Sequence, residues 1–118
     1  MNEYREIEVT AIQPKIGGML NGIDLRENIT NEILEEIHKQ WMRFMVLVFP
    51  NQDITDEQHI AFGRKFGDLE IHPSVTHRSS KNVEIYRVSN VDETGNIIPP
   101  ETTSWQYLNL TWLWHSDS

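Results

Sequence analysis

The sequence predicts an α+β fold, because two helical segments are set among segments whose apolar residues alternate as they do in strands. Residues 7–12 alternate apolar and polar side chains and are expected to form a strand. Turns are indicated after this strand by the pairs Gly17-Gly18 and Asn21-Gly22. A chain of 118 residues has the size of one ordinary domain and can bury a modest core.

A first helix is expected from about residue 31 to residue 45. Thr30 precedes it, and its hydroxyl can accept a hydrogen bond from a backbone N–H of the first turn. Acidic residues stand early in the segment and basic residues late, as the helix dipole favours. The apolar face predicted to pack on the core consists of Ile33, Ile37, Trp41, Phe44 and Met45.

Residues 46–49 are all apolar and predict a short buried strand, which Pro50 ends. A second helix is expected to begin after Thr55, because Thr55 and Gln58 have the spacing of a capping box. Its apolar side chains are Ile60, Phe62 and Phe66. Gly67 is expected to end it.

The C-terminal half is expected to contain more extended chain. Residues 83–91 alternate apolar and polar side chains and predict a strand. Residues 92–100 are rich in turn-forming residues and predict a loop. Residues 105–114 are aromatic, and we expect them to be extended.

Composition narrows the class of function. The formal net charge of −8 disfavours binding to nucleic acid, which needs clustered Lys and Arg, but it leaves room for a small anionic substrate. Cysteine is absent, which excludes disulfides and thiolate metal sites. The longest apolar run, residues 44–49, is too short to span a membrane, and no secretory signal is evident at the N-terminus. We therefore expect a cytoplasmic protein with no membrane partner.

The most informative motif is His115-Ser116-Asp117. In an extended segment, residues two positions apart project to the same side, so His115 and Asp117 can bind one metal ion. A His and a carboxylate are two of the three ligands of the facial triad that holds non-haem Fe(II). A surface His beside an Asp is the commoner explanation of this tripeptide alone. The preceding Leu113 and Trp114 favour a metal site, since they would supply an apolar wall that limits water around the metal.

The other histidines carry weaker signals. His38 and His59 lie in predicted helices among charged residues, and both are expected to be solvent-exposed. His72 precedes a proline on a predicted loop, where a functional role and a structural role are both open. The adjacent pair His77-Arg78 can bind an anion.

Four tryptophans could suggest an aromatic pocket. Trp41 lies on the apolar face of the first predicted helix, so we expect it to pack in the core. For Trp105, Trp112 and Trp114, a substrate pocket and a core position are equally open.

Four segments, taken in order, resemble the TauD/TfdA family of Fe(II)- and 2-oxoglutarate-dependent dioxygenases along nearly the whole chain. The segments are Asn21-Gly22-Ile23-Asp24-Leu25-Arg26, residues 46–54 (VLVFPNQDI), residues 58–69 (QHIAFGRKFGDL) and Leu113-Trp114-His115-Ser116-Asp117-Ser118. The last segment and residues 88–91 look most like the 2,4-dichlorophenoxyacetate dioxygenase branch. Ile71-His72-Pro73 is similar instead to the taurine dioxygenase branch, in which the matching His contacts the anionic group of the substrate.

The resemblance implies a double-stranded β-helix (jelly-roll) fold, of which residues 1–118 are expected to be the N-terminal part of a single domain. It implies His115 and Asp117 as iron ligands and His72 as a substrate contact. Thr111 stands where the taurine branch has a substrate-contacting Asn, so that role is not carried over. The family's second metal His and its 2-oxoglutarate Arg lie beyond residue 118. We therefore expect the chain to be truncated, to expose unpaired strand edges and to be inactive alone.

The intact protein is accordingly expected to be an oxidoreductase that uses Fe(II), with 2-oxoglutarate and O₂ as co-substrates. The reaction would yield succinate and CO₂ and hydroxylate a small organic acid, such as an aryloxyalkanoate or a sulfonate. Homo-oligomerisation is left open. One alternative is a non-catalytic remnant of the family that acts as a binding module. Another is a metal-dependent hydrolase, in which His72 or His77 completes a site with His115 and Asp117.

Overall fold

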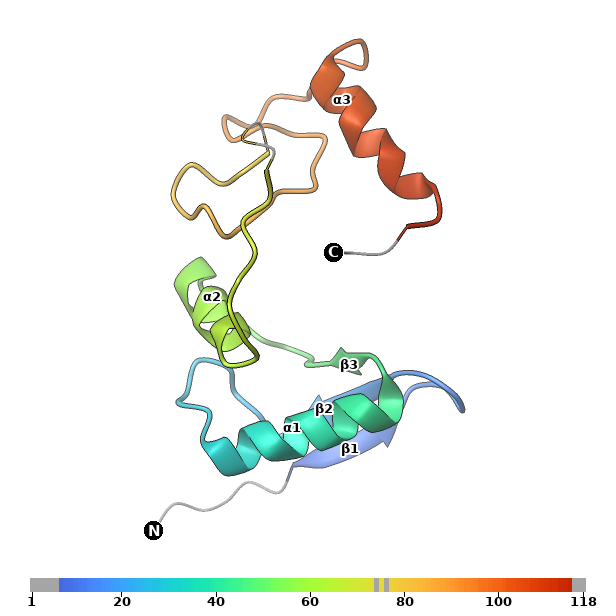
Figure 1. The fold of residues 1–118 in the computed structure, drawn as a ribbon, viewed down its shortest axis with the longest axis vertical. Helices are drawn as coiled ribbons and strands as arrows, with labels where there is room; N and C mark the ends of the chain where they lie inside the picture. The colour runs from blue at the N-terminus through green and yellow to red at the C-terminus, as the bar shows by residue number, and fades with distance from the viewer. Residues whose placement is uncertain (1–6, 74, 76, 116–118) are drawn as a thin grey trace. The chain divides into compact units, whose positions relative to one another are not determined.

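The computed structural model describes residues 7–73, 75 and 77–115, which form two compact units that divide between Gly67 and Asp68. Unit 1 is the N-terminal one and unit 2 the C-terminal one. The elements, in chain order, are β1 (Glu8–Ala11), β2 (Gly18–Asn21), α1 (Asn31–Phe44), β3 (Leu47–Val48), α2 (Asp56–Arg64), α3 (Thr103–Leu108) and the 3₁₀ helix η1 (Asn109–Trp112) (Figure 1). The predicted α+β class is confirmed by this mixture of a small sheet and helices.

Unit 1 contains a three-stranded sheet in the order β1-β2-β3. β1 pairs with β2 in antiparallel fashion, with Val9 opposite Leu20. β2 pairs with β3 in parallel fashion, with Gly18 opposite Leu47. Helix α1 connects these two parallel strands and lies across one face of the sheet (Figure 1). The expected strand over residues 7–12 is thus confirmed as β1.

Gly18 was expected in a turn, but it is the first residue of β2. The turn is made by Gly17, whose φ of 92° is in the left-handed region that favours glycine. Gly18 serves a different purpose, because a Cβ added to it would lie 2.7 Å from Cδ2 of Phe44. Glycine at this position therefore allows the end of α1 to approach the sheet closely.

The core of unit 1 forms where α1 packs on β2. Leu20 and Ile37 are each only 1% exposed. Three further buried apolar side chains, Ile23, Leu25 and Ile29, come from the segment between β2 and α1. Burial of each such side chain stabilises the fold by roughly 1.5–3 kcal/mol.

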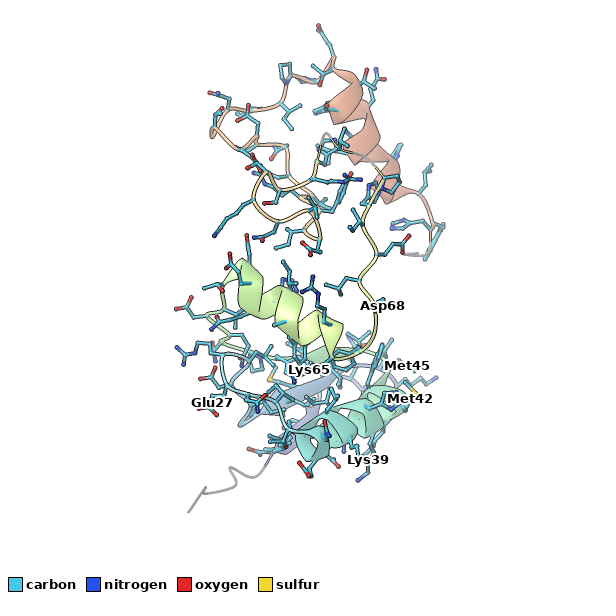
Figure 2. All side chains as sticks on the ribbon, turned by 60° about the vertical axis from the view of Figure 1, so that its left-hand side comes forward. Glu27, Lys39, Met42, Met45, Lys65 and Asp68 are labelled. Atoms are coloured by element: carbon cyan, nitrogen blue, oxygen red, sulfur yellow. The ribbon has the colours of Figure 1, made fainter. Side chains whose placement is uncertain are left out.

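Helix α1 begins as predicted, with the Thr30 hydroxyl accepting a hydrogen bond from the N–H of Ile33. Two residues of the predicted apolar face do not pack in the core. Trp41 is 41% exposed, because the buried face is centred on Ile37 and Trp41 lies at its border, where its ring contacts Phe66. Met45 is 59% exposed and caps the helix with a φ of 63°. Figure 2 shows Met45 near the C-terminal end of α1.

Strand β3 is shorter and more exposed than predicted. It comprises only Leu47 and Val48, and Val46 and Val48 are both exposed. β3 lies at the edge of the described sheet, where it pairs with β2 and contacts α1. The expectation of a strand is confirmed, whereas that of a buried strand is wrong for these two valines.

Helix α2 has the predicted capping box. The Thr55 hydroxyl accepts a hydrogen bond from the N–H of Gln58, and the Gln58 side chain accepts one from the N–H of Thr55. The helix ends at Arg64 rather than continuing to Gly67. Phe66 therefore lies beyond the helix, and it is exposed.

Gln52 joins two loops of unit 1 that are distant in the sequence. Its Oε1 accepts a hydrogen bond of 2.9 Å from the N–H of Leu25. Its Nε2 donates to the carbonyl oxygens of Ile23, at 2.9 Å, and of Pro50, at 3.1 Å. One side chain thus satisfies three backbone groups and fixes the segment after β3 against the segment after β2.

Unit 2 differs most from the expectation. Residues 83–91 were predicted to form a strand, but the described residues here make only isolated bridges, Arg78 with Tyr86 and Val91 with Ile97. Alternating residues form a strand only where a partner strand pairs with them along their length. Residues 105–114 were expected to be extended, yet they lie mostly in α3 and η1. The signal for α3 is Thr102, whose hydroxyl accepts a hydrogen bond from the N–H of Trp105.

The predicted loop over residues 92–100 is confirmed. Oδ1 of Asp92 accepts hydrogen bonds from the N–H of Thr94 at 2.9 Å, its hydroxyl at 2.7 Å and the N–H of Asn96 at 2.9 Å. The hydrogen bond from the Thr94 hydroxyl is the main reason that the pKa of Asp92 is lowered. Gly95 completes the turn with a φ of 86°.

No helix among the described residues is long and apolar enough to cross a membrane.

We predict that Gln52→Ala lowers the free energy of unfolding of unit 1 by about 1–3 kcal/mol, because three partly buried backbone groups lose their hydrogen-bond partner. Urea unfolding followed by circular dichroism measures this change. Gln13→Ala is the matched control, since Gln13 is exposed, and it should change stability by less than about 0.5 kcal/mol. Equal effects of the two substitutions would contradict the role given to Gln52.

We also predict that the turn at residues 92–96 loses order in acid. The folded pKa of Asp92 lies below the ordinary value of 3.8, so its contribution to stability is complete above that value and is lost as the pH falls through the folded pKa. The amide NMR shifts of Thr94 and Asn96, followed against pH, measure the transition. Asp92→Asn should remove it. A transition midpoint above the ordinary value would show that the carboxylate is not stabilised.

Candidate functional site

His115 is the predicted metal ligand that the structure describes. It follows η1 and is exposed. Its Nδ1 lies 2.7 Å from the carbonyl oxygen of Leu113. Because a carbonyl oxygen can only accept, Nδ1 is the donor of this contact, and in the neutral ring the lone pair then lies on Nε2. The other predicted ligand, Asp117, lies outside the described residues.

The environment of His115 differs from the expectation. Leu113 is exposed and Trp114 is fully exposed, at 105%, so these side chains do not form the predicted apolar wall in the described part of the chain. Trp112 is also exposed, and Trp105 is half-buried. Neither Trp112 nor Trp114 therefore belongs to a core. Over residues 7–73, 75 and 77–115, no group of three His, Cys, Asp or Glu side chains is placed to hold a metal ion.

His72, the predicted substrate contact, lies on a loop, as expected, and is half-buried. Its ring stacks on Tyr86, with 4.1 Å between the ring centroids and 31° between the planes. Its backbone carbonyl accepts a hydrogen bond of 2.8 Å from Nε of Arg78. The loop position of His72 is thus fixed by two side chains that the sequence did not single out for this purpose.

The pair His77-Arg78 does not present two neighbouring groups to an anion. His77 is buried, and its ring lies edge-on to Tyr86, with the centroids 5.7 Å apart. Arg78 is half-buried and donates to the backbone of His72. The expectations for His38 and His59 are confirmed, since both are exposed on their helices.

Unit 2 also contains an open pocket of about 680 Å³. Its charged lining residues are Arg78, Arg87, Asp92 and Glu93, and its lining also includes several Ser and Thr residues. Arg87 lies 3.8 Å from Glu93, and it donates to the carbonyl of Val91. The pKa of Glu93 is lowered mainly by a hydrogen bond from the backbone N–H of Ser80. The pocket therefore contains both signs of charge.

The sequence is similar to one protein family and to named relatives. Residues 8–118 match the family model described as "Taurine catabolism dioxygenase TauD, TfdA family". The chain is 34% identical over 110 residues to the alpha-ketoglutarate-dependent 2,4-dichlorophenoxyacetate dioxygenase of Cupriavidus pinatubonensis, covering 91% of this chain and 38% of that protein. It is 29% identical over 118 residues to the alpha-ketoglutarate-dependent sulfonate dioxygenase of Saccharomyces cerevisiae, covering 95% of this chain and 26% of that protein.

The fold is similar as well. A crystal structure of AAD-2 in complex with Mn(II) and N-oxalylglycine superposes with a TM-score of 0.77 at 31% identity, covering 95% of this chain and 36% of that one. The chain thus spans between 26% and 38% of the length of these relatives. Because the family match extends over almost all of its residues, the chain belongs to the TauD/TfdA family of dioxygenases.

Proposed function

We propose that this chain forms part of a non-haem Fe(II)- and 2-oxoglutarate-dependent dioxygenase that hydroxylates a small organic acid. The observation that carries the proposal is the contact between Nδ1 of His115 and the carbonyl of Leu113, at 2.7 Å. Histidines that bind metals characteristically donate their other ring N–H to a carbonyl or carboxylate, which fixes the tautomer and the orientation of the ring. The contact between Nδ1 of His115 and the Leu113 carbonyl supports such a role for His115.

In this proposal His115 and Asp117 are two of the three iron ligands. The third ligand, a His, and an Arg that pairs with 2-oxoglutarate would come from sequence beyond the segment matched here. Residues 1–118 would be the N-terminal part of one jelly-roll domain and would be inactive alone. Bound Fe(II) would supply the activation of O₂ that the reaction requires. The contribution of this chain would be to hold the metal and to orient the substrate.

The proposed substrate is a small molecule with an anionic group. The names of the relatives mention 2,4-dichlorophenoxyacetate in one case and a sulfonate in another, and both are small organic anions. His72 would contact the anionic group of such a substrate. This assignment favours aryloxyalkanoates and alkylsulfonates over neutral compounds. It fits a chain whose net charge of −8 argues against a polyanionic partner.

We predict that Mn(II), a paramagnetic substitute for Fe(II), broadens the ring NMR signals of His115 in the 118-residue chain at lower concentration than those of His38 or His59. The proposed chelate of His115 and Asp117 binds more tightly than one exposed imidazole. Asp117→Ala should remove the preference. His38→Ala is the control and should leave it unchanged. Equal broadening of all three histidines would exclude a metal site here.

The activity is testable once the domain is complete. Residues 1–118 can be joined to the remainder of the Cupriavidus pinatubonensis relative, and succinate release can be followed with Fe(II), 2-oxoglutarate and 2,4-dichlorophenoxyacetate. We expect release that depends on 2-oxoglutarate and falls to background with His115→Ala, because the iron loses a ligand. His59→Ala should retain it. Release that survives His115→Ala would contradict the metal assignment.

A further inference from the structure

His72 lies on a loop, yet two side chains from elsewhere in unit 2 hold it in place. One is Tyr86, whose ring stacks on the imidazole at 4.1 Å between centroids. The other is Arg78, whose Nε donates to the His72 carbonyl at 2.8 Å. The first contact constrains the plane of the ring, and the second constrains the backbone that carries it. Together they restrict where the imidazole can point.

Tyr86 and Arg78 are themselves held by a short antiparallel pairing. Arg78 and Tyr86 lie opposite each other as a β-bridge. On either side of this bridge, the N–H of Arg87 donates to the carbonyl of His77 at 2.8 Å, and the N–H of Ser79 donates to that of Ile85 at 2.9 Å. The two residues that contact His72 therefore lie opposite each other in one β-bridge, which two backbone hydrogen bonds flank.

Tyr86 also contacts a second histidine, His77, which is buried. His77 is 6% exposed, and its ring is nearly perpendicular to that of Tyr86, at 70° with 5.7 Å between centroids. Tyr86 thus contacts one stacked and one edge-on imidazole. An aromatic ring with a buried neighbour is a firmer support for His72 than a ring exposed on every side would be.

We infer that Tyr86 and Arg78 are positioning residues for His72, which they hold in a fixed orientation toward the anionic group of the substrate. This inference rests on the proposed function, in which His72 contacts that group. Orientation matters because a hydrogen bond from an imidazole to an anion weakens steeply when its angle departs from linearity. A loop that had to be ordered on binding would add a conformational entropy cost to the affinity.

The first test uses the 118-residue chain and the ring proton NMR signals of His72. Stacking on Tyr86 should shift these signals to high field relative to a free histidine. Tyr86→Phe keeps the aromatic ring and should keep the shift, whereas Tyr86→Leu should abolish it. Arg78→Gln should move the signals toward the free position. Arg87→Gln is its matched control, since Arg87 contacts Val91 and Glu93 instead, and should have little effect.

The second test uses the completed dioxygenase described above. Tyr86→Leu should raise KM for the anionic substrate roughly two- to tenfold, the range that an aromatic pair contributes, with KM for 2-oxoglutarate unchanged. Tyr86→Phe, which keeps the aromatic ring, should leave KM for the anionic substrate at the wild-type value. In a His72→Ala background Tyr86→Leu should have no further effect on KM. This non-additivity separates positioning of His72 from a general loss of stability.

The two possible failures are distinguishable. A wild-type chain with no high-field shift of His72 would overturn the inference, while the dependence of succinate release on His115 could still support the proposed function. Tyr86→Leu and His72→Ala acting additively on KM would also overturn it. Succinate release that survives His115→Ala would instead contradict the proposed function, whatever the NMR signals show.

Discussion

The packing of α1 against β2 is the interaction on which the fold of unit 1 depends. Leu20 on the strand and Ile37 on the helix are almost completely buried, and the other buried apolar residues of the described chain lie between them in sequence. This packing requires Gly18, because a side chain there would collide with Phe44. It also brings β3 beside β2, since α1 is the connection between these two parallel strands.

Unit 2 is stabilised in a different way. None of its described apolar residues is fully buried, so its conformation depends mainly on polar and aromatic contacts. The Asp92 turn, the Arg78 contact with His72 and the stacking of Tyr86 are examples. Each contributes modestly, because hydrogen bonds in folded proteins replace hydrogen bonds to water. The segment that contains every proposed site residue is thus the one with less hydrophobic stabilisation.

Features that depend on neighbouring residues could be predicted from the sequence. The caps at Thr30 and Thr55 and the turn at Asp92 are examples, because each is formed by hydrogen bonds within four positions. The expected strand over residues 83–91 failed because alternation does not supply a pairing partner. The expected extended segment after Trp105 is instead mostly helical, because Thr102 accepts a hydrogen bond in the first turn of α3, and aromatic composition does not indicate such a contact.

The sequence names candidate site residues, but it does not give the contacts that those residues make. The sequence singled out His72 and His115, yet the contacts that orient them are not readable from spacing. For His72 they come from residues 6 and 14 positions away, at Arg78 and Tyr86, through a bridge that itself pairs distant residues. For His115 the partner is the backbone of Leu113, a group that every residue has.

The weak hydrophobic stabilisation of unit 2 has a consequence for the proposed chemistry. A ligand that binds only the ordered form of a segment stabilises that form by mass action, and part of its binding free energy is used to order the segment. In the proposed function, contacts that order His72 beforehand, such as the stack with Tyr86, would reduce this cost. By the same argument, a metal held by His115 would stabilise the end of the described chain, where aromatic side chains are now exposed. Order in unit 2 and occupancy of the proposed site are therefore thermodynamically linked.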